Sequence, residues 1–144
     1  MDLYFRKIIS WVLSETLEAS HVVKCIEKAK QSRHIENPLI FHCDRGCQYV
    51  SEAFHKATEG MIHSYSKKAY PWDNACIESF HALLKREWIN RFKIFNYTHA
   101  YKLIFEYIET FYNTVRIHSH CGYLSPNEYE EQYLKNLETT VTSL

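Results

Sequence analysis

The chain has 144 residues, with 17 Lys and Arg against 17 Asp and Glu, so its formal net charge is zero. That length suits one compact domain, and an apolar share of 46% excludes a disordered chain or a fibrous repeat. No apolar run approaches the roughly 20 residues of a membrane-spanning helix, and the N-terminus lacks the residue order of a secretory signal, so we expect a cytoplasmic protein with no membrane partner.

The zero net charge conceals a gradient along the chain. Basic residues outnumber acidic ones between residues 67 and 120, and the balance reverses from residue 121 onward. A weakly basic centre rich in His, Tyr and Trp suits a nucleic-acid surface, but a solvated helix face has the same composition. The five cysteines show no paired C-x-x-C spacing, so we interpret them as reduced thiols and expect no structural zinc site.

The first half of the chain alternates between two periodicities. Residues 7–13 form a short apolar, β-branched run that predicts a strand, and apolar residues then recur at helical spacing over residues 16–32. A second strand is expected at 39–43, a short helix from Ser51 to about Thr58, and a third strand at 61–65. This order predicts an α/β domain with helices packed on a parallel or mixed sheet.

The second half is predicted to be mainly helical. After a loop at 66–72, Asp73 or Asn74 can cap a helix that continues to about residue 90. A wide apolar stripe predicts a second long helix over 98–115. Pro126 then begins a last short helix, and residues 139–144 resemble a frayed tail.

Two carboxylates and a lysine stand out as candidates for metal and phosphate chemistry. Asp44 directly follows an apolar strand, and Glu78 lies one turn into the helix that begins at Asp73 or Asn74. Carboxylates on separate rigid elements can converge on Mg²⁺, and Lys85, two turns beyond Glu78, could hold a phosphate nearby. The alternatives are a turn-capping aspartate, a glutamate that suits the helix dipole and an exposed lysine.

Several motifs occur in a fixed order along nearly the whole chain. They are Asp2-Leu3-Tyr4 with Arg6-Lys7, the run Phe41-His42-Cys43-Asp44-Arg45-Gly46-Cys47-Gln48-Tyr49-Val50-Ser51, the run Trp72-Asp73-Asn74-Ala75-Cys76-Ile77-Glu78-Ser79-Phe80, and Tyr112-Asn113-Thr114-Val115-Arg116-Ile117-His118 followed by Gly122 and Ser125-Pro126. Together they resemble the DDE-type insertion-sequence transposases (OrfB-like), which have a retroviral-integrase-like catalytic core.

The resemblance implies an RNase H-like α/β fold, a mixed sheet flanked by helices. It makes Asp44 and Glu78 the second and third catalytic, metal-binding acids of a D-D-E triad, with Mg²⁺ or Mn²⁺ as cofactor. It also implies that Lys85, Arg116 and His118 contact DNA, although basic groups at a helix end can equally serve as caps or pack against the core.

The resemblance also raises expectations about organisation and activity. We expect a partial catalytic core over residues 1–120 and a helical tail over 121–144. The family's first core strand, with its first catalytic aspartate, precedes the segment that matches Asp2–Lys7, so we expect that strand to be missing and the chain to be inactive alone.

Three functions therefore compete. The first is transposition by DNA strand transfer at transposon ends and target DNA, and the second is a non-catalytic DNA-binding or regulatory role. The third is a helical module that pairs with itself as a homo-oligomer or with an upstream-frame transposase subunit.

Overall fold

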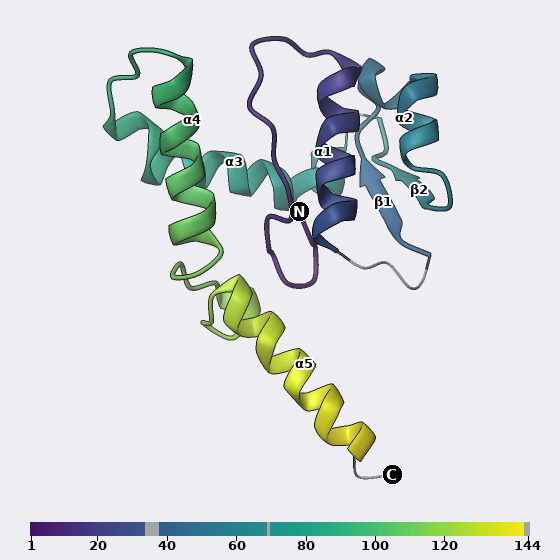
Figure 1. Cartoon of the computed structure of the whole chain (residues 1–144), viewed down its shortest axis with the longest axis vertical. Helices are drawn as coiled ribbons and strands as arrows, with labels where there is room; N and C mark the ends of the chain where they lie inside the picture. Colours follow the sequence, from purple (N-terminus) through teal and green to yellow (C-terminus); the bar gives the residue numbers. More distant parts are fainter. Residues whose placement is uncertain (34–37, 69, 143–144) are drawn as a thin grey trace. The chain divides into compact units, whose positions relative to one another are not determined.

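The computed structural model describes residues 1–33, 38–68 and 70–142, and the chain divides into two compact units (Figure 1). One unit is the continuous segment Ile9–Glu78. The other unit joins the N-terminal segment Met1–Ile8 to Ser79–Leu144. The first eight residues therefore belong to the same unit as the C-terminal half of the sequence.

The unit Ile9–Glu78 carries the strand and helix alternation that the sequence predicts after residue 16. Its elements are α1 (Ala19–Ser32), β1 (Ile40–Cys43), α2 (Glu52–Ala57) and β2 (Ile62–Tyr65). The two strands pair in parallel, with Ile40 opposite Ile62 and Cys43 opposite Tyr65. Ser51 caps α2, because its Oγ accepts a hydrogen bond of 3.2 Å from the backbone N–H of Phe54.

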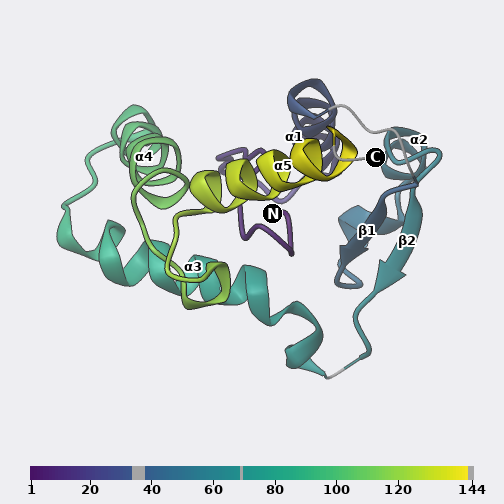
Figure 2. The ribbon, with the colours of Figure 1, turned by 90° about the horizontal axis from the view of Figure 1, so that it is seen from below.

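One face of this small sheet carries the core of the unit. Phe54 is fully buried and packs with Ile26 and Cys43, so α1, α2 and β1 contribute to one apolar cluster. Figure 2 shows the two strands side by side with α2 close to them. On the other face, Ile40 and Ile62 remain 64% and 54% exposed.

The prediction of a strand over residues 7–13 is wrong, because the structure has no strand there. The backbone N–H and C=O of Ile8 are instead bonded to the side-chain amide of Asn113, each at 3.0 Å. Within the described residues the sheet therefore has two parallel strands, which agrees with the parallel alternative that the residue pattern predicts and is smaller than the mixed sheet that the family resemblance implies.

The second unit is mainly helical, and its described residues also include an isolated antiparallel bridge between His118 and Leu124. Its elements are α3 (Ala75–Glu87), whose first turn lies in the other unit, α4 (Tyr97–Phe105), a π-helical segment (Glu106–Tyr112) and α5 (Pro126–Thr142). The helix predicted over 98–115 is therefore regular only to Phe105. The wider π turns bring Tyr107, Ile108 and Tyr112 into the interior together.

The last helix is longer than the sequence indicates. Ser125 and Glu128 form a reciprocal cap at its start, with the Ser125 Oγ donating to the Glu128 carboxylate at 2.6 Å. The helix continues to Thr142, so the tail predicted from residue 139 is wrong as far as 142, and residues 143–144 lie outside the described part. No helix in the described ranges is both long and apolar enough to cross a membrane.

Candidate functional site

Asp44 lies directly beyond β1, as the sequence predicts for a ligand at a strand end. Its side chain is exposed, and its Oδ1 accepts a hydrogen bond of 2.9 Å from the backbone N–H of Gly46. This contact fixes one carboxylate oxygen in the turn. The neighbouring Cys43 is buried, and burial followed by the charge of Asp44 raises the pKa of its thiol to about 11. Cys43 is therefore a protonated core residue at neutral pH and no thiolate ligand.

His42, two residues before Asp44, is held by the neighbouring strand. Its Nδ1 lies 2.9 Å from the Ser64 Oγ, and its Nε2 lies 3.1 Å from the Ser66 Oγ. Ser66 is also tied to β1 through its backbone N–H, which donates to the carbonyl oxygen of Cys43 at 2.9 Å. These bonds fix the end of β1 next to Asp44, a role that the sequence did not indicate.

Glu78, His81 and Lys85 share one face of α3. They are three, four and seven residues apart, which is the spacing of side chains along one side of an α-helix, and all three are exposed. Partial desolvation of the ring, followed by the charge of the nearby Lys85, holds the pKa of His81 below its ordinary 6.5, so its imidazole is mostly neutral at pH 7. The face therefore presents a carboxylate, a neutral imidazole and an ammonium group in sequence.

The donor chemistry of Asp44 and Glu78 fits a hard divalent cation, because carboxylate oxygens are the ligands that Mg²⁺ prefers. Within the three described ranges, no group of three or more His, Cys, Asp or Glu side chains could hold a metal ion. Neither carboxylate therefore belongs to a three-ligand cluster there.

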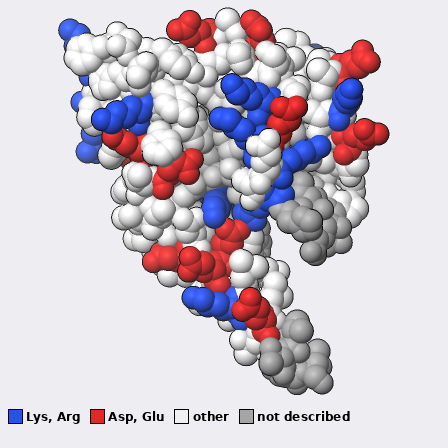
Figure 3. Space-filling view, in the orientation of Figure 1, with Lys and Arg blue, Asp and Glu red and all other residues white. Residues whose placement is uncertain are grey.

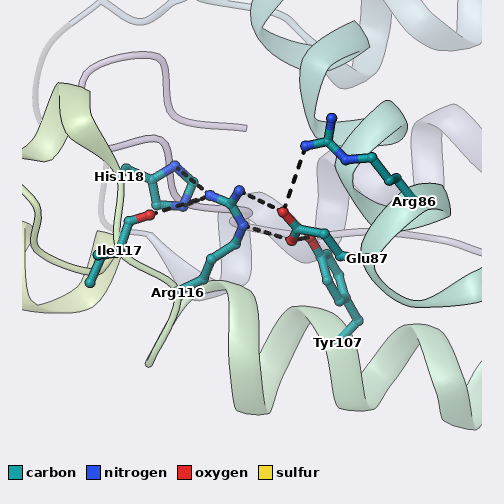
Figure 4. Close-up of polar contacts among 6 residues, drawn as sticks. All are labelled: Arg86, Glu87, Tyr107, Arg116, Ile117 and His118. Carbon is teal, nitrogen blue, oxygen red and sulfur yellow. Dashed lines mark hydrogen bonds and ion pairs between the residues drawn. The ribbon is translucent and has the colours of Figure 1, made fainter.

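Arg116, a predicted DNA contact, forms an ion pair inside the second unit (Figure 4). Its Nε and Nη2 donate to the two carboxylate oxygens of Glu87 at 2.8 and 2.7 Å. Tyr107 donates its hydroxyl to the same carboxylate at 2.8 Å. These bonds hold the pKa of Glu87 below its usual range, with the Arg116 bond as the main cause. The guanidinium is therefore engaged in packing, which is the alternative that the sequence left open.

His118, the other predicted contact after the long helix, lies against Arg116. Both ring nitrogens are 3.5 Å from the Arg116 Nη1, and the ring meets Tyr112 edge to face at 4.8 Å. Burial, followed by the charge of Arg116, lowers the pKa of His118 to about 4. The imidazole is uncharged at pH 7, so it offers a phosphate no positive charge there.

The depressed pKa of His118 predicts an acid-sensitive contribution to stability. Its ordinary pKa is 6.5, so the unfolded chain binds the proton first as the pH falls, and the contribution is full above about pH 6.5 and lost toward pH 4. Between pH 7 and pH 5 the natural chain should lose on the order of 1 kcal/mol more than His118→Phe, after allowance for solvent screening. Urea unfolding at both pH values measures this, and an equal pH response in the two proteins would contradict it.

Comparisons with known proteins match this chain over both units. Two protein-family models match the chain, and both are described as integrase core domain. One matches residues 1–71 and the other matches residues 59–126. The transposase for insertion sequence element IS904 of Lactococcus lactis subsp. lactis (strain IL1403) is 39% identical over 133 residues, which cover 91% of this chain and 53% of that protein. The transposase InsF for insertion sequence IS3A of Escherichia coli (strain K12) is 35% identical over 136 residues, which cover 93% and 47%.

The chain belongs to the insertion-sequence transposases with an integrase core domain. This confirms the family that the ordered motifs indicate. This family member spans about half the length of the curated relatives that it matches.

The C-terminal signature of this transposase chain has a structural use that the sequence did not reveal. Asn113 binds the backbone of Ile8, Arg116 binds Glu87, and Ser125 caps α5. Asn113 and Arg116 of the signature therefore join segments that are far apart in sequence, and Ser125 acts locally. The motif that contains Asn113 indicates no role for this residue, and no local pattern marks Glu87 as the partner of an arginine.

Proposed function

We propose that this chain contributes part of an integrase-type core that acts on DNA phosphodiester bonds during transposition. The observation that carries the proposal is the placement of the family motifs, with Asp44 at the end of β1 and Glu78 on an exposed face of α3. In this proposal β1 and β2 belong to a larger mixed, RNase H-like sheet, residues 1–120 form the core, and residues 121–144 form a helical tail.

Each proposed residue has a role that its surroundings support. Asp44 keeps one carboxylate oxygen in the Gly46 turn, which leaves the other oxygen to bind an ion. Glu78 would supply a second oxygen ligand, and Lys85 would hold a DNA phosphate from the same face of α3. When bound, Mg²⁺ or Mn²⁺ would supply charge stabilisation at the scissile phosphate.

DNA contact by Arg116 and His118 stays a prediction of the family resemblance. The Glu87 carboxylate neutralises Arg116, and His118 is uncharged at neutral pH, so we assign them a weaker part than Lys85. The DNA partners in this proposal are transposon ends and target DNA, and the protein partners are a second copy or an upstream-frame subunit.

We expect no strand transfer by this chain alone, because we assign no residue of the sequence to the family's first catalytic aspartate. A non-catalytic DNA-binding or regulatory role is the alternative.

Manganese binding and DNA strand transfer, measured on the same samples, test the proposal. Paramagnetic resonance titration should show Mn²⁺ binding that Asp44→Asn and Glu78→Gln each weaken by about tenfold, because each removes one oxygen ligand. Glu59→Gln, an exposed acid outside the site, is the control and should bind like the natural chain. Unchanged Mn²⁺ binding in both variants would overturn the metal site. Strand transfer by the natural chain that is lost in Asp44→Asn would overturn the expected inactivity.

A further inference from the structure

Residues 91–105, which we name the aromatic-basic segment, lead from the end of α3 into α4. The segment contains no Asp or Glu, and it contains three basic residues, Arg91, Lys93 and Lys102. It also exposes several aromatic rings, with relative exposures of 43% for Phe92, 73% for Phe95, 45% for Tyr97, 41% for Tyr101 and 45% for Phe105. Exposed rings and cations thus alternate along one short stretch of the second unit.

Phe95, the most exposed ring of the segment, is held in a defined position. It stacks on His99 with ring centroids 5.3 Å apart and an interplanar angle of 14°. Asn96 caps α4 by accepting from the His99 N–H at 2.8 Å, which fixes the turn that presents Phe95. The ring is therefore ordered by its own helix end while most of its surface faces solvent.

The rings of α4 continue this surface along the helix. Tyr97, Tyr101 and Phe105 follow one another at intervals of four residues, so they lie along one side of α4. Leu103 is buried on the opposite side. In Figure 3 the area where Figure 1 draws α4, at the upper left, is largely white with blue groups on it and at its left edge, and red groups lie at its lower end.

The charges near these rings complement a polyanion. Arg91 and Lys93 are exposed, and Lys102 is 74% exposed with its Nζ 3.9 Å from Glu106, a surface ion pair that water weakens. Glu106 lies just beyond the segment, so no acidic side chain lies between the rings along the sequence.

We propose that the aromatic-basic segment binds single-stranded DNA. The flat faces of bases would stack on Phe95 and the α4 rings, and the phosphates would lie near Arg91, Lys93 and Lys102. Stacking needs bases whose faces are free, which a single strand offers and a paired duplex does not. This surface includes neither Asp44 nor Glu78 and needs no metal, so it goes beyond the proposed function and can be tested separately.

The test compares two oligonucleotides of equal charge in EDTA. One is a fluorescent oligothymidylate of about 15 nucleotides, within the range of single-strand site sizes, and the other is an abasic strand of the same length. In fluorescence anisotropy the whole chain should bind the base-containing strand about tenfold more tightly, since stacking on an aromatic ring requires the base. Phe95→Leu should remove most of that difference and keep the apolar character of the position.

Two further variants separate stacking from charge and from general effects. Lys93→Glu should weaken binding of both strands, because both carry the same phosphates. Tyr123→Leu removes a ring that is 70% exposed outside the segment and should leave both affinities unchanged. Circular dichroism of each variant checks that it is folded.

Three results would overturn the proposal. They are equal affinity for the two strands, no binding of either strand, and an equal effect of Phe95→Leu and Tyr123→Leu. Light scattering tests whether this surface binds a second copy of the chain instead of DNA. A concentration-dependent dimer that Phe95→Leu abolishes, without oligonucleotide binding, would assign the surface to self-association and refute the DNA proposal.

Discussion

The variant Asn113→Ala should lower the free energy of unfolding by about 3 kcal/mol, because it leaves one buried N–H and one buried C=O without partners. Asn113 donates through Nδ2 to the carbonyl oxygen of Ile8 and accepts through Oδ1 from its N–H, each at 3.0 Å. The two residues are only 3% and 5% exposed, so water cannot replace the lost bonds. The contact joins residues 105 positions apart, so its loss also weakens the attachment of the N-terminal segment.

An isosteric variant tests the hydrogen bonds separately from the lost volume. Asn113→Asp keeps the acceptor for the Ile8 N–H but places a carboxylate against the Ile8 carbonyl oxygen. Protonation restores a donor, so the folded state of this variant should bind a proton more tightly than its unfolded state. Its stability relative to the natural chain should therefore increase as the pH falls from 7 toward 4.

Urea unfolding of the natural chain and of both variants provides the measurement. Asn136→Ala, an exposed asparagine on α5, is the matched control and should change the stability by less than about 0.5 kcal/mol. A loss for Asn113→Ala no larger than that of the control would show that the Ile8 contact does not stabilise the fold.

Local elements were predictable wherever their signals lie close together in the sequence. β1, α2 and β2 all begin and end within one residue of their predicted bounds, since strand periodicity and the Ser51 cap act over a few residues. The extended run at 7–13 carries the apolar pattern of a strand, yet Ile8 bonds to a side chain far along the chain. A hydrophobic pattern indicates which residues are buried. It does not identify the group that forms hydrogen bonds with their backbone.

In the candidate site, too, features set by local sequence were predictable and long-range contacts were not. The placement of Asp44 after a strand, and of Glu78 and Lys85 along one helix, follows from local spacing and from the family motifs. The partner of Arg116 lies 29 residues away at the end of α3, and no periodicity marks Glu87 among the acids of the chain. The long-range ion pair with Glu87 therefore engages the Arg116 guanidinium, and the local sequence did not predict this.

The variant Glu87→Gln should lower the free energy of unfolding by about 2 kcal/mol. Removing one partner of a buried ion pair costs about 3 to 5 kcal/mol, and a smaller loss is expected here because the two side chains retain some exposure. The side chains of Glu87 and Arg116 are 24% and 19% exposed. Glutamine offers one acceptor where the carboxylate binds Arg116 through two oxygens and also accepts from Tyr107.

The pH dependence of the same variant provides an independent check. Because Arg116 holds the pKa of Glu87 below its ordinary value of 4.5, the pair stabilises the natural chain fully above about pH 4.5 and loses that contribution as the pH falls through the folded-state pKa. The stability difference between the natural chain and Glu87→Gln should therefore shrink under acid conditions. Glu131→Gln, which alters a surface pair 69% exposed at the acid, is the control. If Glu87→Gln unfolds like this control at pH 7, the Arg116 pair does not stabilise the unit, and the guanidinium becomes available again as a DNA contact.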